Sequence, residues 1–382
     1  MNSLMLLFLS LSTSLSLYAE VWVAENSWNK NWENKYRSWV KNKLSPNIFV
    51  EGRYKGIKTD CADAVYSIRA IFAYENSLPF HFRNPNKYGR RYSQEMHEFN
   101  KYSKESDVRF KKFLNWMNSI TGTYTIPGDT YSPFLDNQSV NSGTLYLQFN
   151  EHVQIIKEVE TFGLPIMYSS TVPIEVRELD VEIEMSNPDK NEYYYGLAGF
   201  RNWRSNSNLF YSNAKLKKLG VSSNDQYELH KKHLKTKISF ENLVTEKLSD
   251  GKSKESNEDK IKRYLKQFSR SLKKRVSVVQ DGFNYHKAVN RALNSREIYL
   301  YSTELRDVRI YKSVEKINYL FSKIEEKVGR NFIKSFFGTE TIEIKKGFRI
   351  NLYVLFQRFK EGSVISYDPE DSIEERWGEE ID

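Results

Sequence analysis

Residues 58–80, KTDCADAVYSIRAIFAYENSLPF, place the only cysteine of this 382-residue chain at the start of a predicted helix. Apolar residues follow Cys61 at helical spacing as far as Asn76, and either Thr59 or Asp60 can cap the first turn. The free N–H groups and the positive end of the dipole at a helix start stabilise a thiolate. The stretch therefore predicts either a reactive thiol or a small, inert core residue.

Four short runs rich in β-branched and aromatic residues follow the turn Pro127-Gly128-Asp129. Polar or glycine breaks separate the runs, which favours consecutive antiparallel strands. Together with the cysteine-bearing helix, they predict an α+β domain that ends near residue 204. The four predicted strands are residues 143–150, 152–159, 164–170 and 179–185.

The rest of the chain predicts mainly helices. Residues 27–44 and 107–120 have helical spacing, whereas residues 81–105 are polar and predict an irregular insertion. Residues 205–340 are mostly helical in pattern, and residues 341–367 predict two or three strands. The expected division is a signal peptide at 1–19, an α+β domain at 20–204, a mainly helical domain of unknown role at 205–367, and an acidic tail at 368–382.

The first 19 residues carry no charged side chain and end in Tyr18-Ala19. The short apolar core from Leu4 to Leu11 is typical of a secretory signal peptide cleaved near Ala19, and a buried N-terminal helix is the alternative. We expect an exported protein, periplasmic or extracellular, with no membrane span after cleavage. A single cysteine forms no internal disulfide, so Cys61 is inert, paired with another chain, or reactive.

The formal net charge is +9, although the last fifteen residues hold eight acids against Arg376. The positive charge outside this acidic tail suits an anionic partner such as an acidic wall polymer. The simpler interpretation is that the charge keeps the protein soluble. The chain carries no specific nucleic-acid motif. The oligomeric state stays open.

His152 is the histidine that opens a predicted strand in the same domain as Cys61. A cysteine nucleophile needs such a base, and a polar group to orient its ring. The next predicted strand brings Tyr168, Ser169 and Ser170 alongside. Neither an HxH nor an HExxH spacing occurs, so we expect no metal and no cofactor. The remaining histidines are His81, His97, His230, His233 and His286.

The segments TDCADAVYSIRAIF, PGD and HVQII, between residues 59 and 156, resemble the NlpC/P60 branch of the papain-like superfamily. The resemblance covers roughly residues 48–185. It implies a cysteine peptidase or amidase acting on cell-wall peptides, with Cys61 as nucleophile and His152 as base. The loop RYKGIKTDC resembles the family's loop before the cysteine, which implies that Tyr54 lies near the oxyanion site. Residues 199–202, GFRN, resemble a segment of a broader group of exported bacterial proteins.

The third catalytic position departs from that family. The family places His, Asn, Gln or Asp on the strand after the histidine, whereas this chain offers Tyr168, Ser169 and Ser170. A hydroxyl stabilises an imidazolium less than a carboxylate does. Transglutaminase-like hydrolases are a weaker match, because no aspartate lies between Glu151 and Leu179. The alternative to an enzyme is a non-catalytic binding or scaffold protein on a degenerate papain-like fold.

Overall fold

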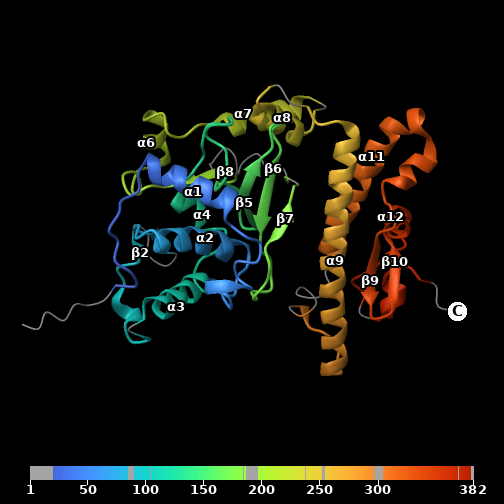
Figure 1. Cartoon of the computed structure of the whole chain (residues 1–382), viewed down its shortest axis with the longest axis horizontal. Helices are drawn as coiled ribbons and strands as arrows, with labels where there is room; N and C mark the ends of the chain where they lie inside the picture. Colours follow the sequence, from blue (N-terminus) through green and yellow to red (C-terminus); the bar gives the residue numbers. More distant parts are fainter. Residues whose placement is uncertain are drawn as a thin grey trace, which may run out of the picture.

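The computed structural model is a mixed α/β structure with antiparallel sheets (Figure 1). The predicted signal peptide lies outside the residues that it describes. Those residues are 20–84, 90–103, 105–183, 185, 197–236, 238–251, 254–295, 297, 304–368 and 370–379.

A six-stranded antiparallel sheet lies at the centre of the N-terminal half, in the order β3-β8-β4-β5-β6-β7. Strands β4, β5, β6 and β7 lie next to one another in chain order, which is the predicted meander, and β7 forms the edge of the sheet. The chain then returns to insert β8 between β3 and β4, a pairing that the sequence analysis did not predict. The strands are β3 (Thr130–Tyr131), β4 (Leu145–Gln148), β5 (His152–Val159), β6 (Pro165–Ser169), β7 (Asp180–Glu182) and β8 (Gly199–Trp203).

Helix α2 (Cys61–Glu75) packs on one face of this sheet, as predicted for the cysteine-bearing helix. It is apolar around most of its circumference and almost entirely buried, because other elements cover the sides that the sheet does not. Val153 and Ile155 of β5 face it from the sheet. The covering elements include α1 (Lys30–Asn42), η1 (Gly52–Tyr54), α3 (Ser106–Asn118) and the hairpin of β1 (His81–Arg83) and β2 (Arg91–Ser93), followed by η2 (His97–Phe99).

The opposite face of the sheet packs against α7 (Asp225–Lys235) and α8 (Phe240–Leu248), which follow the short α6 (Asn213–Lys218). Ile156 and Met167 of the sheet share one apolar core with Phe240 and Leu243 of α8. A side chain at Gly163, in the turn between β5 and β6, would collide with the α8 backbone. Helices α7 and α8 therefore share a core with the sheet, although the predicted division assigned them to the C-terminal domain.

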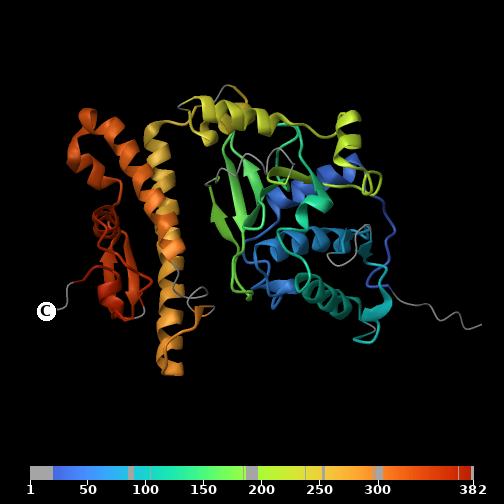
Figure 2. The same ribbon diagram turned by 180° about the vertical axis from the view of Figure 1, so that it is seen from behind.

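The C-terminal unit is built on two long helices, α9 (Asn257–Val289) and α11 (Glu304–Ser335), which pack along each other beside the β7 edge of the sheet (Figures 1 and 2). A buried ion pair, Arg275 with Asp307, joins them, and Ser366 donates to the same carboxylate. Ile183 follows β7 and lies in this second core.

The prediction of strands across residues 341–367 is only half correct. Strands β9 (Thr341–Lys345) and β10 (Phe348–Asn351) form a hairpin, but the next residues form helix α12 (Leu352–Glu361). Asn351 caps this helix and Gly362 ends it in the left-handed conformation. The buried side chains have helical spacing, since they are Leu352, Leu355, Phe356 and Phe359.

The acidic segment at the C-terminus packs on this unit over its described part. A capping box starts the short helix α13 (Ile373–Arg376), and Trp377 is completely buried in the second core. Within the described part of the chain, no helix is both long enough and apolar enough to cross a membrane.

Candidate functional site

Cys61 is the first residue of α2, and a reciprocal capping box fixes the helix start. The Asp60 carboxylate accepts from the N–H of Asp63 at 3.0 Å, and Asp63 accepts from the N–H of Asp60 at 3.0 Å. Asp60 is thus the cap, one of the two residues predicted for it. The arrangement leaves the N–H groups of Cys61 and Ala62 without intrahelical acceptors, as in any first turn.

His152 begins β5 and lies beside the thiol of Cys61. Only 8% of Cys61 and 6% of His152 are exposed, so water has little access to either side chain. The other neighbour of the ring is Glu182 on the edge strand β7, whose Oε1 lies 3.4 Å from Nε2 of His152. The structure therefore brings together a thiol, an imidazole and a carboxylate.

Two further side chains hold the Glu182 carboxylate in place. Ser169 donates its hydroxyl to Oε1, and the amide of Gln154 donates to Oε2. The donors come from the neighbouring strand β6 and from β5, the next strand in the sheet, so Glu182 is bonded to two strands on the same side of β7. Such partners restrict the rotamer of a carboxylate.

The electrostatics of the site favour the charged imidazole. Burial lowers the pKa of His152, but the charge of Glu182 and the contact with the Cys61 thiol raise it, and the result is about 9. At neutral pH the ring is therefore an imidazolium, which donates from both nitrogens.

Asp63, two residues after Cys61, has a carboxyl group that favours the neutral form. Burial and the neighbouring charge of Asp60 raise its pKa to about 8. One of its oxygens accepts from Asp60, and the other has no hydrogen-bond partner among the described residues. At pH 7 the Asp63 carboxyl group is therefore mostly protonated and adds little negative charge to the start of α2.

The residues predicted for the third position have other contacts. The Ser170 hydroxyl donates to the carbonyl of Thr59 at 3.1 Å and accepts from the Thr59 hydroxyl, which anchors the segment before Cys61. Tyr168 packs in the α2-facing core, with the Lys157 ammonium over its ring. The structure shows Glu182, rather than Tyr168 or Ser170, next to the imidazole.

Tyr54 does not lie near the thiol. Its hydroxyl donates to Glu75 at 3.0 Å, and Glu75 is the last residue of α2 whereas Cys61 is the first. At 1.5 Å per residue, the two ends of this helix are roughly 20 Å apart. The placement near an oxyanion site that the resemblance implied is therefore wrong for the Tyr54 hydroxyl.

The Pro-Gly-Asp segment has a structural role in this fold. It forms the short helix α4 (Ile126–Asp129), and the buried Asp129 carboxylate pairs with Arg91 and accepts from Tyr66 of α2 at 2.6 Å. Among the described residues, no group of three or more His, Cys, Asp and Glu side chains is arranged to hold a metal ion.

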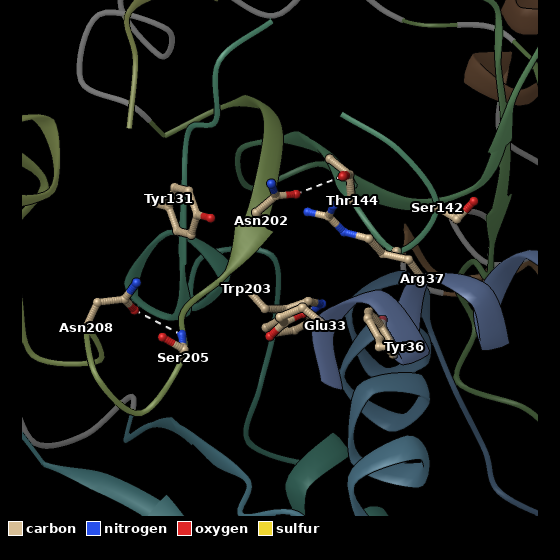
Figure 3. Close-up of a pocket in the computed structure, with 11 residues that line it drawn as sticks. Glu33, Tyr36, Arg37, Tyr131, Ser142, Thr144, Asn202, Trp203, Ser205 and Asn208 are labelled. Carbon is tan, nitrogen blue, oxygen red and sulfur yellow. Dashed lines mark hydrogen bonds between the residues drawn. The ribbon is translucent and has the colours of Figure 1, made fainter. Parts of the chain in front are cut away.

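A cleft, whose lining residues are drawn in Figure 3, lies beside β4. His152 pairs with Gln148 at one end of this strand, whereas the cleft is reached at Thr144, next to the other end. The cleft is thus separate from the group of Cys61, His152 and Glu182.

Comparison with protein-family models, with curated proteins and with solved structures finds no match to this chain. The geometry of the site therefore carries the functional argument.

Glu182 is the site residue that the sequence analysis missed. It lies within the predicted strand at 179–185, but it acts across an intervening strand instead of from the strand directly after His152. Residues 179–185 alternate apolar and acidic side chains, the ordinary pattern of a strand with one exposed face, so no local signal distinguishes Glu182 from the other two acids.

Proposed function

We propose that this protein is a thiol-dependent amide hydrolase in which Cys61 is the nucleophile, His152 the acid and base, and Glu182 the group that orients and charges the imidazole. The contact of His152 with both the thiol and the Glu182 carboxylate carries this proposal. Nucleophile, base and orienting carboxylate are the parts that covalent catalysis by cysteine requires.

In the first half of the reaction, the Cys61 thiolate attacks the amide carbon. The carbonyl oxygen becomes an oxyanion, for which the N–H of Cys61 at the helix start is the natural donor. His152 then gives its proton to the leaving nitrogen, the C–N bond breaks, and the acyl group remains on Cys61 as a thioester. In the second half, His152 takes a proton from water and the hydroxide attacks the thioester. The C–S bond then breaks, which releases the carboxylic acid and restores the Cys61 thiolate beside the His152 imidazolium.

The substrate class rests on the resemblance alone, and we propose cell-wall peptide, reached by export of the chain. We also propose that the packing of α2 on the antiparallel sheet corresponds to that of papain-like hydrolases. The basic character of the chain suits an anionic wall polymer. The buried thiol favours an extended, narrow peptide over a bulky folded protein, because little of Cys61 is exposed.

Alkylation of Cys61 by iodoacetamide at pH 6–7 tests the reactive thiol. An ordinary thiol is mostly protonated at this pH and reacts slowly, whereas a thiolate paired with an imidazolium reacts fast. We expect rapid labelling of the native protein and labelling at least about tenfold slower in His152→Ala. His286→Ala, a histidine on α9, is the control and should label like the wild type.

Digestion of purified peptidoglycan tests the reaction and the substrate. The wild type should release new amino groups, and Cys61→Ser should release none.

Labelling of Cys61 by iodoacetamide that requires denaturant would contradict the catalytic proposal. Fast labelling without digestion would contradict the substrate class, and binding of peptidoglycan without cleavage would favour the binding or scaffold function.

A further inference from the structure

We infer that the exposed face of helix α9 binds a linear anionic polymer that carries no bases. Residues 260–280 of this helix hold eight Lys and Arg side chains and neither Asp nor Glu. Charge of one sign over so long a stretch attracts polyanions from a distance. The assignment of this polymer to the cell wall rests on the proposed function, whereas its binding does not depend on the chemistry of Cys61.

Half of these cations are already used within the protein. They join α9 to other elements or to the segment before it, and each is neutralised by one carboxylate. Arg263 pairs with Glu255, Lys273 with Glu340, Lys274 with Asp180 and Arg275 with Asp307.

Three of the other cations form a row on the exposed side of the helix. Lys262, Lys266 and Arg270 are four residues apart, so they lie on one face, on successive turns about 6 Å apart. All three are exposed, and none has a hydrogen bond or an ion pair with another described residue. Like charges at this spacing destabilise a helix, and a bound polyanion relieves their repulsion.

The acidic segment at the C-terminus does not cover this row over its described part. Glu374 of that segment pairs with Lys345 of the β9–β10 hairpin, and Glu379 pairs with Arg358 of α12. The row is therefore open to an anion from outside the chain.

The surface around the row favours a polymer without bases over nucleic acid or a membrane. Bases stack on exposed aromatic side chains, but the exposed residues from Lys262 to Lys273 are all cations. A helix that binds a membrane inserts its apolar face among the lipids, whereas the apolar face of α9 is buried in the core shared with α11. What remains for recognition is a line of charges.

The row leads towards the edge of the sheet that carries Glu182. Lys274, one turn after Arg270, pairs with Asp180 at the start of β7, and α9 lies beside this strand (Figures 1 and 2). A polymer held on the row would raise the effective concentration of any peptide attached to it near Cys61.

Equilibrium binding of fluorescently labelled inorganic polyphosphate to the full chain tests the inference. Cys61→Ser serves as the parent, so the result does not depend on hydrolysis. We expect saturable binding at about 0.1 M salt. The combined variant Lys262→Gln, Lys266→Gln and Arg270→Gln should weaken it about 10- to 100-fold and reduce the slope of log affinity against log salt by about 2. Gln is a good helix former, so the melting temperature should not change.

The matched control removes three exposed cations from the short helix α6, which lies away from α9 (Figure 1). The combined variant Lys215→Gln, Lys217→Gln and Lys218→Gln should keep the affinity of the parent. The absence of saturable binding, or an equal loss in the two combined variants, would overturn the inference.

Two further ligands test the kind of partner. Tighter binding of oligo(dT), or of vesicles of phosphatidylglycerol, than of polyphosphate would assign the row to nucleic acid or to a membrane and overturn the inference. Introduced into the wild type, neither set of substitutions should change the labelling of Cys61 by iodoacetamide. A failure of polymer binding is thus distinct from a failure of the proposed hydrolase.

Discussion

At the scale of single residues, Glu182 controls the charge of the candidate site. Burial by itself disfavours an imidazolium, so a lone His152 in this position would stay neutral at pH 7. The charge of Glu182 and the contact with Cys61 together reverse that preference and raise the pKa of His152 to about 9. The hydroxyl of Ser169 and the amide of Gln154 donate to this carboxylate and fix its position.

Replacing the carboxylate with an amide tests this role. In Glu182→Gln the pKa of His152 should fall below 7, as measured by NMR titration of the ring, and alkylation of Cys61 at pH 6 should slow at least about tenfold. Glu158→Gln on the same sheet is the control, because Glu158 pairs loosely with Lys41. An unchanged His152 titration in Glu182→Gln would refute the role.

The same pair predicts a pH-dependent stability. The pKa of His152 is about 6.5 in the unfolded chain and about 9 in the folded protein, so protonation of His152 stabilises the fold. This stabilisation is complete below pH 6.5 and is lost as the pH rises through 9. The free energy of unfolding lost in Glu182→Gln should therefore be largest below pH 6.5, by roughly 1–3 kcal/mol, and shrink towards pH 9.

At the scale of elements, the start of α2 is held by two carboxyl groups in different protonation states. Asp60 is the N-cap, and Asp63 is the buried partner whose pKa is raised to about 8. A carboxyl group that is easier to protonate in the folded protein destabilises it as the pH rises, because the unfolded chain then binds fewer protons.

Asp63→Asn keeps an oxygen that can accept from the Asp60 N–H and removes the titration. The variant should match the wild type near pH 4 and be more stable at pH 8, by roughly 1–3 kcal/mol in urea unfolding. Asp107→Asn should act in the opposite direction at neutral pH, because the hydrogen bonds from Arg53 lower the pKa of Asp107 to about 2. Parallel pH profiles for wild type and Asp63→Asn would contradict this account.

At the scale of the whole molecule, the C-terminal unit holds the strand that carries Glu182. β7 is the edge strand of the sheet, and a short edge strand has a partner on only one side. Lys274 of α9 pairs with Asp180 at the start of β7, and Ile183 after its end packs in the core of the C-terminal unit. The helical half thus supports the geometry of the site, although none of its described side chains belongs to the group of Cys61, His152 and Glu182.

Lys274→Met should loosen this edge. We expect amide hydrogen exchange across residues 179–183 to speed up by as much as about fivefold, the equivalent of about 1 kcal/mol, and Cys61 alkylation to slow. Lys273→Met is the control, since Lys273 pairs with Glu340 instead of β7. Equal exchange in the two variants would show that the Lys274–Asp180 pair does not hold the strand.

Local patterns in the sequence determined the helix at Cys61, its cap and the meander from β4 to β7, because caps and side-chain periodicity act over a few residues. The prediction of a strand at residues 352–361 was wrong. Apolar and aromatic residues there suit a strand, but their helical spacing and the caps at both ends favour helix α12. Only the tertiary structure decided that Glu182 reaches His152 across a strand, that Tyr54 lies at the far end of α2, and that α7 and α8 cover the sheet. These contacts join residues far apart in the chain, and their positions depend on how whole elements pack, which no short window of sequence encodes.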